Sequence, residues 1–251
     1  MSGKFAWVAT VLAAVGLVAA AAVPPREGVL GSYRTPLQGR ERNQRANALR
    51  AARALDGTVL APGEVLSFND TVGPWTADRG YLKAPVSYGG EMHPAWGGGV
   101  CQTSTTLYNA ALVAGLEIVE RHRHQWAPHY CPLGRDAAVA QYDIDLRLRN
   151  THPSPVRIEV RPTGDSLGIA ILGREAGPMA AVHTTVRGVL PPREVLRIDS
   201  GLQPGECHRL VRGAPGYRVL VYREFRDAPG RRELVSEDRY PPVNRLVVAG
   251  P

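Results

Sequence analysis

The sequence predicts an α+β protein in which a helix bearing a cysteine packs on an antiparallel β-sheet, followed by a small β-rich C-terminal domain. Three observations lead to this fold class. Apolar residues recur at helical spacing within residues 41–57 and 102–114, and they alternate at strand spacing from residue 143 onward. A second stretch of alternating residues follows residue 178. The apolar fraction of 44% is ordinary for a folded core.

Residues 1–24 predict a signal peptide or an N-terminal membrane anchor. Lys4 precedes a mainly apolar run over residues 5–23, and two prolines follow that run. One positive charge, an apolar run and small residues at its end are typical of an export signal. The run is also close to the length that spans a bilayer, so cleavage and retention as an anchor both stay open. Either alternative places the rest of the chain outside the cytoplasm, in the cell envelope.

Residues 25–100 predict a linker, a helix, strands and a loop. Residues 25–40 are rich in Pro, Gly and polar residues, which favours a linker. A helix follows within 41–57, and Gly57 is its expected stop. Short apolar runs broken by Pro-Gly and Asn-Asp predict strands and turns over 58–76. Residues 80–100 contain Gly, Pro and aromatic residues without periodicity, and we expect an ordered loop there.

The middle of the chain predicts a second helix and an antiparallel meander. Helical periodicity returns over residues 102–114, and an alternating strand pattern follows over 116–122. Three further alternating runs occupy residues 143–150, 155–160 and 166–172. Turn-forming residues separate these runs, so we expect three consecutive antiparallel strands with one buried face.

The C-terminal part predicts a β-rich unit with a hairpin. Two alternating runs, residues 217–225 and 233–240, flank the turn sequence DAPGRR. A final apolar run closes the chain. The expected domain limits are residues 1–24 for the signal or anchor, 25–40 for the linker, 41–177 for the cysteine-bearing domain and 178–251 for the β-rich domain.

Charge and cysteine content limit the classes of partner. The formal charge is +7, carried almost entirely by arginine, and no basic cluster is interleaved with aromatic residues. This pattern does not indicate a nucleic-acid partner, whereas a polyanionic cell envelope fits it. The three cysteines are an odd number for an exported chain. Cys131 and Cys207 could pair and leave Cys101 as the one thiol, or all three could stay free.

Cys101 is the candidate nucleophile. It follows three glycines and precedes the second predicted helix, so its thiol should lie near a helix N-terminus, where the dipole favours thiolate. The free N–H groups of that terminus could also hold an oxyanion. A buried structural cysteine is the alternative interpretation. The residues expected to line a substrate site around the thiol are Trp96, Gly98, Gly99, Gln102 and Tyr108.

The general base should come from the segment RHRHQWAPHYC. His124 is the first candidate and His122 the second, and Asp136 is expected to orient the imidazole, with Asp143 as the alternative. The same segment also permits a metal site, since His and Cys are zinc ligands. Those metal-ligand types are His122, His124, His129 and Cys131. Their spacing matches no known zinc motif, so we expect neither a metal nor another cofactor.

Three long stretches resemble the VanW family, which takes its name from an accessory protein of vancomycin-resistance operons. They begin PGEVLSFNDTVGPWT, GGGVCQTSTTLYNAALVAG and PLGRDAAVAQYDIDLRLRN. The resemblance covers about residues 35–172. The C-terminal part, with GLQPGE and GAPGYRVLVYREF, is more loosely similar to the glycine-five domain that often follows.

The resemblance implies a surface protein of the bacterial envelope. Some relatives are described as L,D-transpeptidases, whose nucleophile matches Cys101 and whose paired histidines and aspartate match His122, His124 and Asp136. The implied reaction is acyl transfer from a peptidoglycan tetrapeptide stem through a Cys101 thioester, which forms 3-3 cross-links. Two alternatives stay open. The chain could be a non-catalytic cell-wall-binding module, or a metal-dependent wall hydrolase.

Overall fold

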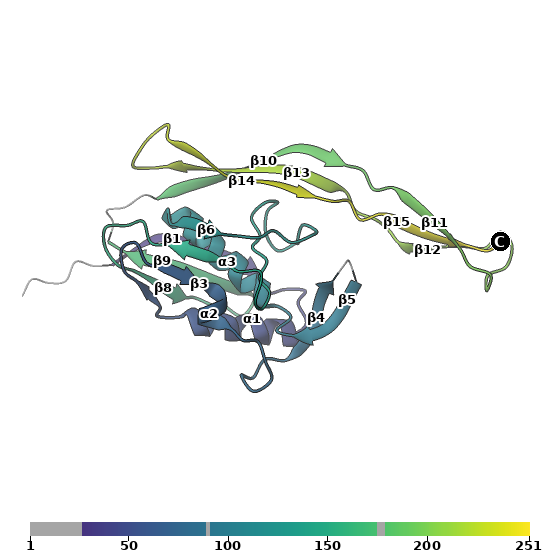
Figure 1. The fold of residues 1–251 in the computed structure, drawn as a ribbon, viewed down its shortest axis with the longest axis horizontal. Helices are drawn as coiled ribbons and strands as arrows, with labels where there is room; N and C mark the ends of the chain where they lie inside the picture. The colour runs from purple at the N-terminus through teal and green to yellow at the C-terminus, as the bar shows by residue number, and fades with distance from the viewer. Residues whose placement is uncertain (1–26, 89–90, 175–178) are drawn as a thin grey trace, which may run out of the picture.

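The computed structural model describes residues 27–88, 91–174 and 179–251, and it shows a predominantly β protein (Figure 1). The structure is 44% strand and 16% helix. The predicted α+β class is therefore wrong, because the protein is mostly β-sheet. The expected loop at 80–100 contains a β-hairpin, which adds strand content that the sequence analysis did not predict. The predicted signal or anchor, residues 1–24, lies outside the described residues.

The described residues contain three helices and fifteen strands. The helices are α1 (Arg42–Leu55), α2 (Phe68–Val72) and α3 (Val100–Ala114). None of them has the length and hydropathy that crossing a membrane requires. The strands before residue 175 are β1 (Gly28–Pro36), β2 (Val59–Leu60), β3 (Val65–Ser67), β4 (Lys83–Tyr88), β5 (Glu91–Trp96), β6 (Glu117–Glu120), β7 (Arg147–Arg149), β8 (Val156–Val160) and β9 (Ser166–Gly173). We call residues 27–174 the body.

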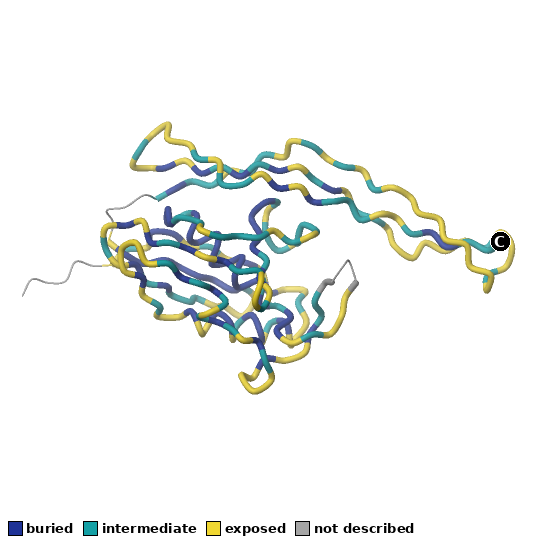
Figure 2. The backbone as a smooth tube through the Cα atoms, in the orientation of Figure 1, coloured by how far each residue is buried: buried dark blue, intermediate teal, exposed yellow. Residues whose placement is uncertain are grey.

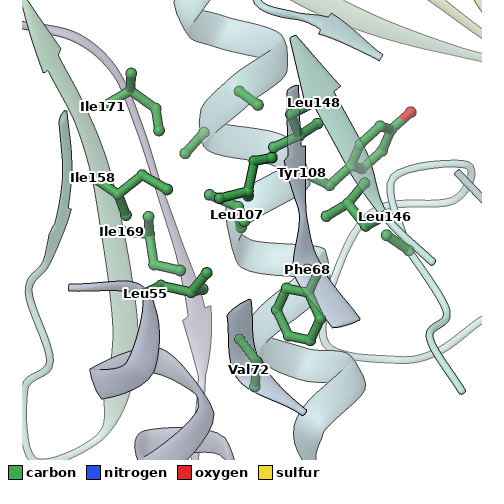
Figure 3. Packing of buried hydrophobic residues seen from close by; sticks show 14 of the residues in the cluster. Leu55, Phe68, Val72, Leu107, Tyr108, Leu146, Leu148, Ile158, Ile169 and Ile171 are labelled. Carbon is green, nitrogen blue, oxygen red and sulfur yellow. The ribbon is translucent and has the colours of Figure 1, made fainter. Parts of the chain in front are cut away.

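Helix α3 lies at the centre of the body, between two sheets. One sheet has the order β1-β9-β8-β2 and the other the order β3-β7-β6. Figure 3 shows Ile169 and Ile171 of the first sheet on one side of the helix and Leu148 of the second on the other. Nearly every residue of α3 is buried, which is typical of a helix enclosed on all sides. The predicted single apolar face therefore understates how deeply this helix is buried.

The predicted elements of the body are confirmed in part. Helix α1 occurs within 41–57, and β8 and β9 pair in antiparallel fashion as expected. The first strand of the predicted meander is misplaced, because β7 pairs with β3 and β6 in the other sheet. A long connection, residues 150–155, carries the chain from one sheet to the other. Periodicity along a strand cannot specify its partner, so this exchange between sheets was not predictable.

Residues 180–249 form an extended β structure, which we call the β arm (Figure 1). Its strands are β10 (Ala180–Leu190), β11 (Glu194–Ile198), β12 (Cys207–Val211), β13 (Gly216–Phe225), β14 (Arg232–Tyr240) and β15 (Arg245–Ala249). They make two successive sheets, ordered β10-β13-β14 and β11-β15-β12. The hairpin predicted between β13 and β14 is confirmed.

The first sheet of the β arm lies against the body, whereas the second extends away from it. Figure 2 shows buried residues along the near part of the arm and exposed ones along the far part. Every residue of β11 and β12 is exposed. On the near side, the buried Arg223 of β13 donates to the Leu116 carbonyl at 2.6 Å. Gly134 (φ +75°) meets Val221 so closely that a Cβ there would lie 2.6 Å from the valine side chain.

Candidate active site around Cys101

The glycines before Cys101 allow two parts of the backbone to approach closely. Gly99 is the N-cap of α3, with φ +109°, a conformation that side chains with a Cβ rarely adopt. A Cβ at Gly99 would collide with the Gln44 carbonyl of α1. Asn47 of α1 donates to the Gly98 carbonyl at 2.9 Å. The glycines thus set the start of α3 against α1, and the helix begins immediately before the cysteine.

Cys101 lies in the first turn of α3 and is partly exposed. Its thiol donates to the Val139 carbonyl at 3.3 Å. The backbone N–H groups on either side of it donate to Gly97 and Gly99 carbonyls, whereas the Cys101 N–H donates to no acceptor among the described residues. A partly exposed thiol therefore lies beside a free N–H at a helix N-terminus, where partial positive charge favours anions.

A run of polar residues in α3 holds the segment 135–139 against the helix. Ser104 donates to the Ala137 carbonyl at 2.7 Å, and the Ala137 N–H donates to Thr105 Oγ1 at 3.0 Å. One turn later, Asn109 donates to the Arg135 carbonyl at 2.6 Å. These buried side chains satisfy the backbone of a segment that has no continuous β partner. Asp136 is thereby fixed beside the cysteine-bearing turn.

His124 reaches Asp136 from the segment that follows β6. The Ala138 N–H donates to the His122 carbonyl at 2.8 Å, which aligns the two segments in antiparallel fashion. The His124 backbone N–H then donates to Oδ2 of Asp136 at 2.6 Å, and Nδ1 of its ring lies 2.7 Å from the same oxygen. With Nδ1–H donating to the carboxylate, Nε2 is left free to interact with Cys101, which contributes to the raised pKa of His124.

The electrostatics of these three residues favour a thiolate–imidazolium pair. Burial is the largest influence on Cys101 and opposes ionisation, but the hydrogen bond and charge of His124 outweigh it, so the thiol pKa is lowered. Burial likewise opposes the charged form of His124, but Asp136 and Cys101 together raise its pKa to about 10. The pKa of Asp136 is lowered despite its burial, because His124 and Arg121 stabilise the carboxylate.

The chain is similar to a known protein family. A family model described as "VanW like protein" matches residues 43–172, which is just over half of the chain. The chain belongs to the VanW-like family. The family resemblance predicted from the sequence is therefore confirmed. Cys101, His124 and Asp136 all lie within the matched range.

Two curated relatives extend the comparison. The uncharacterized protein YoaR of Bacillus subtilis is 39% identical over 142 residues, which cover 57% of this chain and 47% of YoaR. The vancomycin B-type resistance protein VanW of Enterococcus faecalis is 31% identical over 115 residues, which cover 44% and 42%. This VanW-like chain thus spans less than half the length of both relatives.

Two solved structures of G5 domains are also similar to part of the chain. The HP0197-G5 structure is 26% identical, covers 30% of this chain and all of that one, and has a TM-score of 0.19. The G5 domain of the IgA1 protease is 22% identical, covers 32% and 98%, and has a TM-score of 0.23. They are the kind of domain that the C-terminal sequence resembles, but scores this low carry no argument about fold or function.

The other predicted base and orienting residues of this VanW-like domain point elsewhere. His122 is half exposed and lies 2.9 Å from Glu120, not beside the thiol. Asp143 and His129 are both exposed. Among the described residues, no group of three or more His, Cys, Asp or Glu side chains is placed to hold a metal. The three cysteines are all free, so the alternative Cys131–Cys207 disulfide is absent from the structure.

The residues predicted to line a substrate site have different surroundings. Gln102 is buried and donates to the Pro36 carbonyl at 2.7 Å, so its side chain joins α3 to β1. Tyr108 is fully buried within the core, where Figure 3 shows it beside Leu146. Neither side chain faces the solvent near Cys101. Trp96 is 44% exposed at the end of β5 and has Lys83 over its ring.

Two residues that flank the Cys101 site were not predicted from the sequence. Tyr130 donates to the Cys101 carbonyl at 3.4 Å, and its ring meets His124 edge-on with 6.5 Å between centroids. Arg40 stacks over Tyr130 at 4.5 Å and donates to Gln102 at 3.1 Å. Arg40 lies in the predicted linker and Tyr130 in an aperiodic segment, so no pattern marked either residue. The tyrosine of RHRHQWAPHYC was the one available signal.

Proposed function

We propose that this chain acts at the peptidoglycan of the bacterial envelope, and that Cys101 performs acyl transfer there as an L,D-transpeptidase. The observation that carries the proposal is Cys101 at a helix N-terminus, where the charge of His124 favours its thiolate, together with the hydrogen bond from His124 to the buried Asp136. A nucleophile, a base and an orienting carboxylate are the groups that covalent acyl transfer requires. The family resemblance supports the choice of wall peptide as substrate.

In the proposed first half-reaction, the Cys101 thiolate attacks the carbonyl of the diaminopimelate residue that precedes the terminal D-Ala of a tetrapeptide stem. In this proposal the Cys101 N–H donates to the oxyanion that develops on that carbonyl oxygen. The C–N bond then breaks, the imidazolium of His124 protonates the departing D-Ala amine, and a thioester on Cys101 remains.

The second half-reaction uses the same residues in the reverse order. Neutral His124 accepts a proton from the side-chain amine of a second stem as that amine attacks the thioester. The C–S bond breaks, and the thiolate and imidazolium are restored beside a 3-3 cross-link. Asp136 stays ionised throughout, because its lowered pKa lies far below neutral pH. Water in place of the amine would give an L,D-carboxypeptidase with the same groups.

The test of this proposal is intact-mass analysis after incubation with a disaccharide-tetrapeptide. The wild-type chain should gain the mass of the donor minus D-Ala, whereas Cys101→Ala should gain nothing. Free D-Ala should appear in step with the adduct. A folded wild-type protein with a reduced thiol that gives neither adduct nor product would overturn the acyl-transfer proposal.

A second candidate is a non-catalytic cell-wall-binding module, favoured by the fully exposed strands β11 and β12. Their side chains include exposed apolar residues, among them Leu196 and Ile198, at the end of the arm farthest from the body. Family membership and the similarity to the enterococcal vancomycin-resistance protein support binding at least as well as catalysis. This candidate predicts that Cys101→Ala pulls down with purified sacculi as well as wild type does. Failure of both chains to sediment with sacculi would eliminate it.

A further inference from the structure

The β arm supplies a hydrogen bond to the carboxylate behind His124. Tyr240, the last residue of β14, is 1% exposed, and its hydroxyl donates to Oδ1 of Asp136 at 2.5 Å. The two residues are 104 positions apart in the chain. Burial, followed by the charge of Asp136, raises the pKa of Tyr240, so its hydroxyl keeps its proton. Docking of the arm is what brings this donor to the site.

Arg121 joins the arm to the same carboxylate by a second route. Its guanidinium donates to Oδ1 of Asp136 at 3.2 Å and to the two oxygens of Asp238 at 2.7 and 2.8 Å. Asp238 lies on β14 two residues before Tyr240, so both side chains share one face of the strand. The Arg121 side chain is 7% exposed, which shields these ion pairs from water. Asp238 thereby holds the guanidinium away from a bidentate contact with Asp136.

All four acceptor positions of the Asp136 carboxylate are occupied. Oδ1 accepts from Tyr240 and Arg121, and Oδ2 accepts from the backbone N–H and the ring Nδ1–H of His124. The side chain is fully buried, so a broken bond would not be replaced by water. Rotation of the carboxylate would cost several of these bonds at once. Oδ2 is therefore held toward His124 by donors on its other oxygen.

We infer that Tyr240 and Asp238 are positioning residues of the Cys101 site, and that the β arm is part of the catalytic unit. Both act through Asp136, Tyr240 directly and Asp238 by way of Arg121. The inference deepens the proposed acyl transfer and rests on it for its catalytic meaning. In physical terms, the β arm determines how strongly Asp136 stabilises the protonated form of His124.

The sign of the effect follows from the charges around His124. Without the Tyr240 hydroxyl, Oδ1 of Asp136 keeps only Arg121 as a donor, so the carboxylate is held less firmly toward His124. His124 then loses part of its negative partner, and the Cys101 thiolate loses part of its positive one. The other titratable groups beside the cluster include Tyr130, edge-on to His124, and Arg123, which stacks over Tyr240. Arg121 also lies over the ring of Tyr108, and Cys131 and Arg135 lie close enough to interact electrostatically with the cluster. None of these groups carries a carboxylate that could replace Asp136.

The test is the pH profile of Cys101 alkylation in the full chain. Iodoacetamide labelling is followed on the Cys101 peptide by mass spectrometry for wild type, Tyr240→Phe and Asp238→Asn. The control is Tyr222→Phe, a tyrosine of β13 in the same sheet that stacks with Arg232 and does not contact the site. Both site variants should raise the apparent pKa of Cys101 by about 0.5 to 1 unit. They should also lower kcat about 10-fold with little change in KM.

The outcomes separate this inference from the proposed function. A lowered wild-type pKa that stays unchanged in both site variants would overturn the inference alone. A wild-type Cys101 that titrates like a free thiol would overturn the thiolate–imidazolium pair on which the proposed function depends. Equal shifts in the Tyr222→Phe control would also overturn the inference, because they would reflect a general effect on the arm. Asp238→Asn keeps the test valid if Tyr240→Phe does not fold.

Discussion

Burial and neighbouring residues shift the pKa of the Cys101 thiol in opposite directions. Partial burial alone would keep it neutral, since a desolvated thiolate is unfavourable. The imidazolium of His124 reverses that preference, and Asp136 in turn keeps the imidazole charged, with a pKa of about 10. The thiolate–imidazolium pair should therefore persist up to the pH at which His124 loses its proton, about 10. His124 is the residue on which the state of Cys101 depends most directly.

Substitution of His124 tests this balance at the residue scale. In His124→Ala, burial is no longer opposed, so the pKa of Cys101 should rise. Its alkylation rate at neutral pH should fall by about 10-fold or more. The measurement is iodoacetamide labelling of the Cys101 peptide against pH. His122→Ala is the matched control, because His122 pairs with Glu120 and should leave the profile unchanged. An equal loss in both variants would contradict the assignment of His124.

Helix α3 performs two tasks at the element scale. Its apolar residues fill the space between the two sheets of the body, and its polar residues hold segment 135–139 in place. Both tasks depend on where the helix begins, because a shift along its axis would move Cys101 relative to Asp136. The contact of Gly99 with α1 fixes that start. Adding a side chain at Gly99 should therefore destabilise the first turn of α3.

Gly99→Ala should therefore destabilise the chain more than a comparable glycine substitution elsewhere. The new Cβ would meet both an unfavourable φ and the Gln44 carbonyl, at a cost of about 2–4 kcal/mol. Gly63→Ala is the control, because Gly63 also has a positive φ, +78°, but nothing lies within 4 Å of the added Cβ. That variant should lose only about 1 kcal/mol. Urea unfolding of both variants measures the difference, and equal losses would show that the contact with α1 does not matter.

At the scale of the whole molecule, the two ends of the β arm have different surroundings. The near end buries Arg223, Asp238 and Tyr240 against the body and contributes donors and charge to the Asp136 cluster. The far end, with β11 and β12, exposes every residue of those strands (Figure 2). Wall attachment through the far end and chemistry at the near end are compatible roles for one arm. The sacculus and alkylation experiments test these roles separately.

The secondary structure was predictable where periodicity was strong and local. Helix α1, helix α3 and the β13–β14 hairpin follow from apolar spacing and turn residues within a short window. The hairpin β4–β5 was missed, because its prolines and aromatic residues do not alternate clearly. The assignment of β7 to a second sheet was also missed, since a strand pattern carries no information about its partner. The predicted α+β class was wrong because the structure contains more strand than these local patterns indicated.

By itself, the sequence determined the chemistry-bearing residues and the family to which the chain belongs. These residues stand in local features that can be read directly from the sequence. The features are a cysteine after glycines, a histidine-rich segment and an aspartate in a turn that contains glycine. Tertiary structure alone decided which of these residues meet. It placed His124 rather than His122 beside Cys101, and it buried Gln102 and Tyr108 away from the site. It also brought Tyr240 of the arm to Asp136, because hydrogen bonds and ion pairs form between neighbours in space, whatever their separation along the chain.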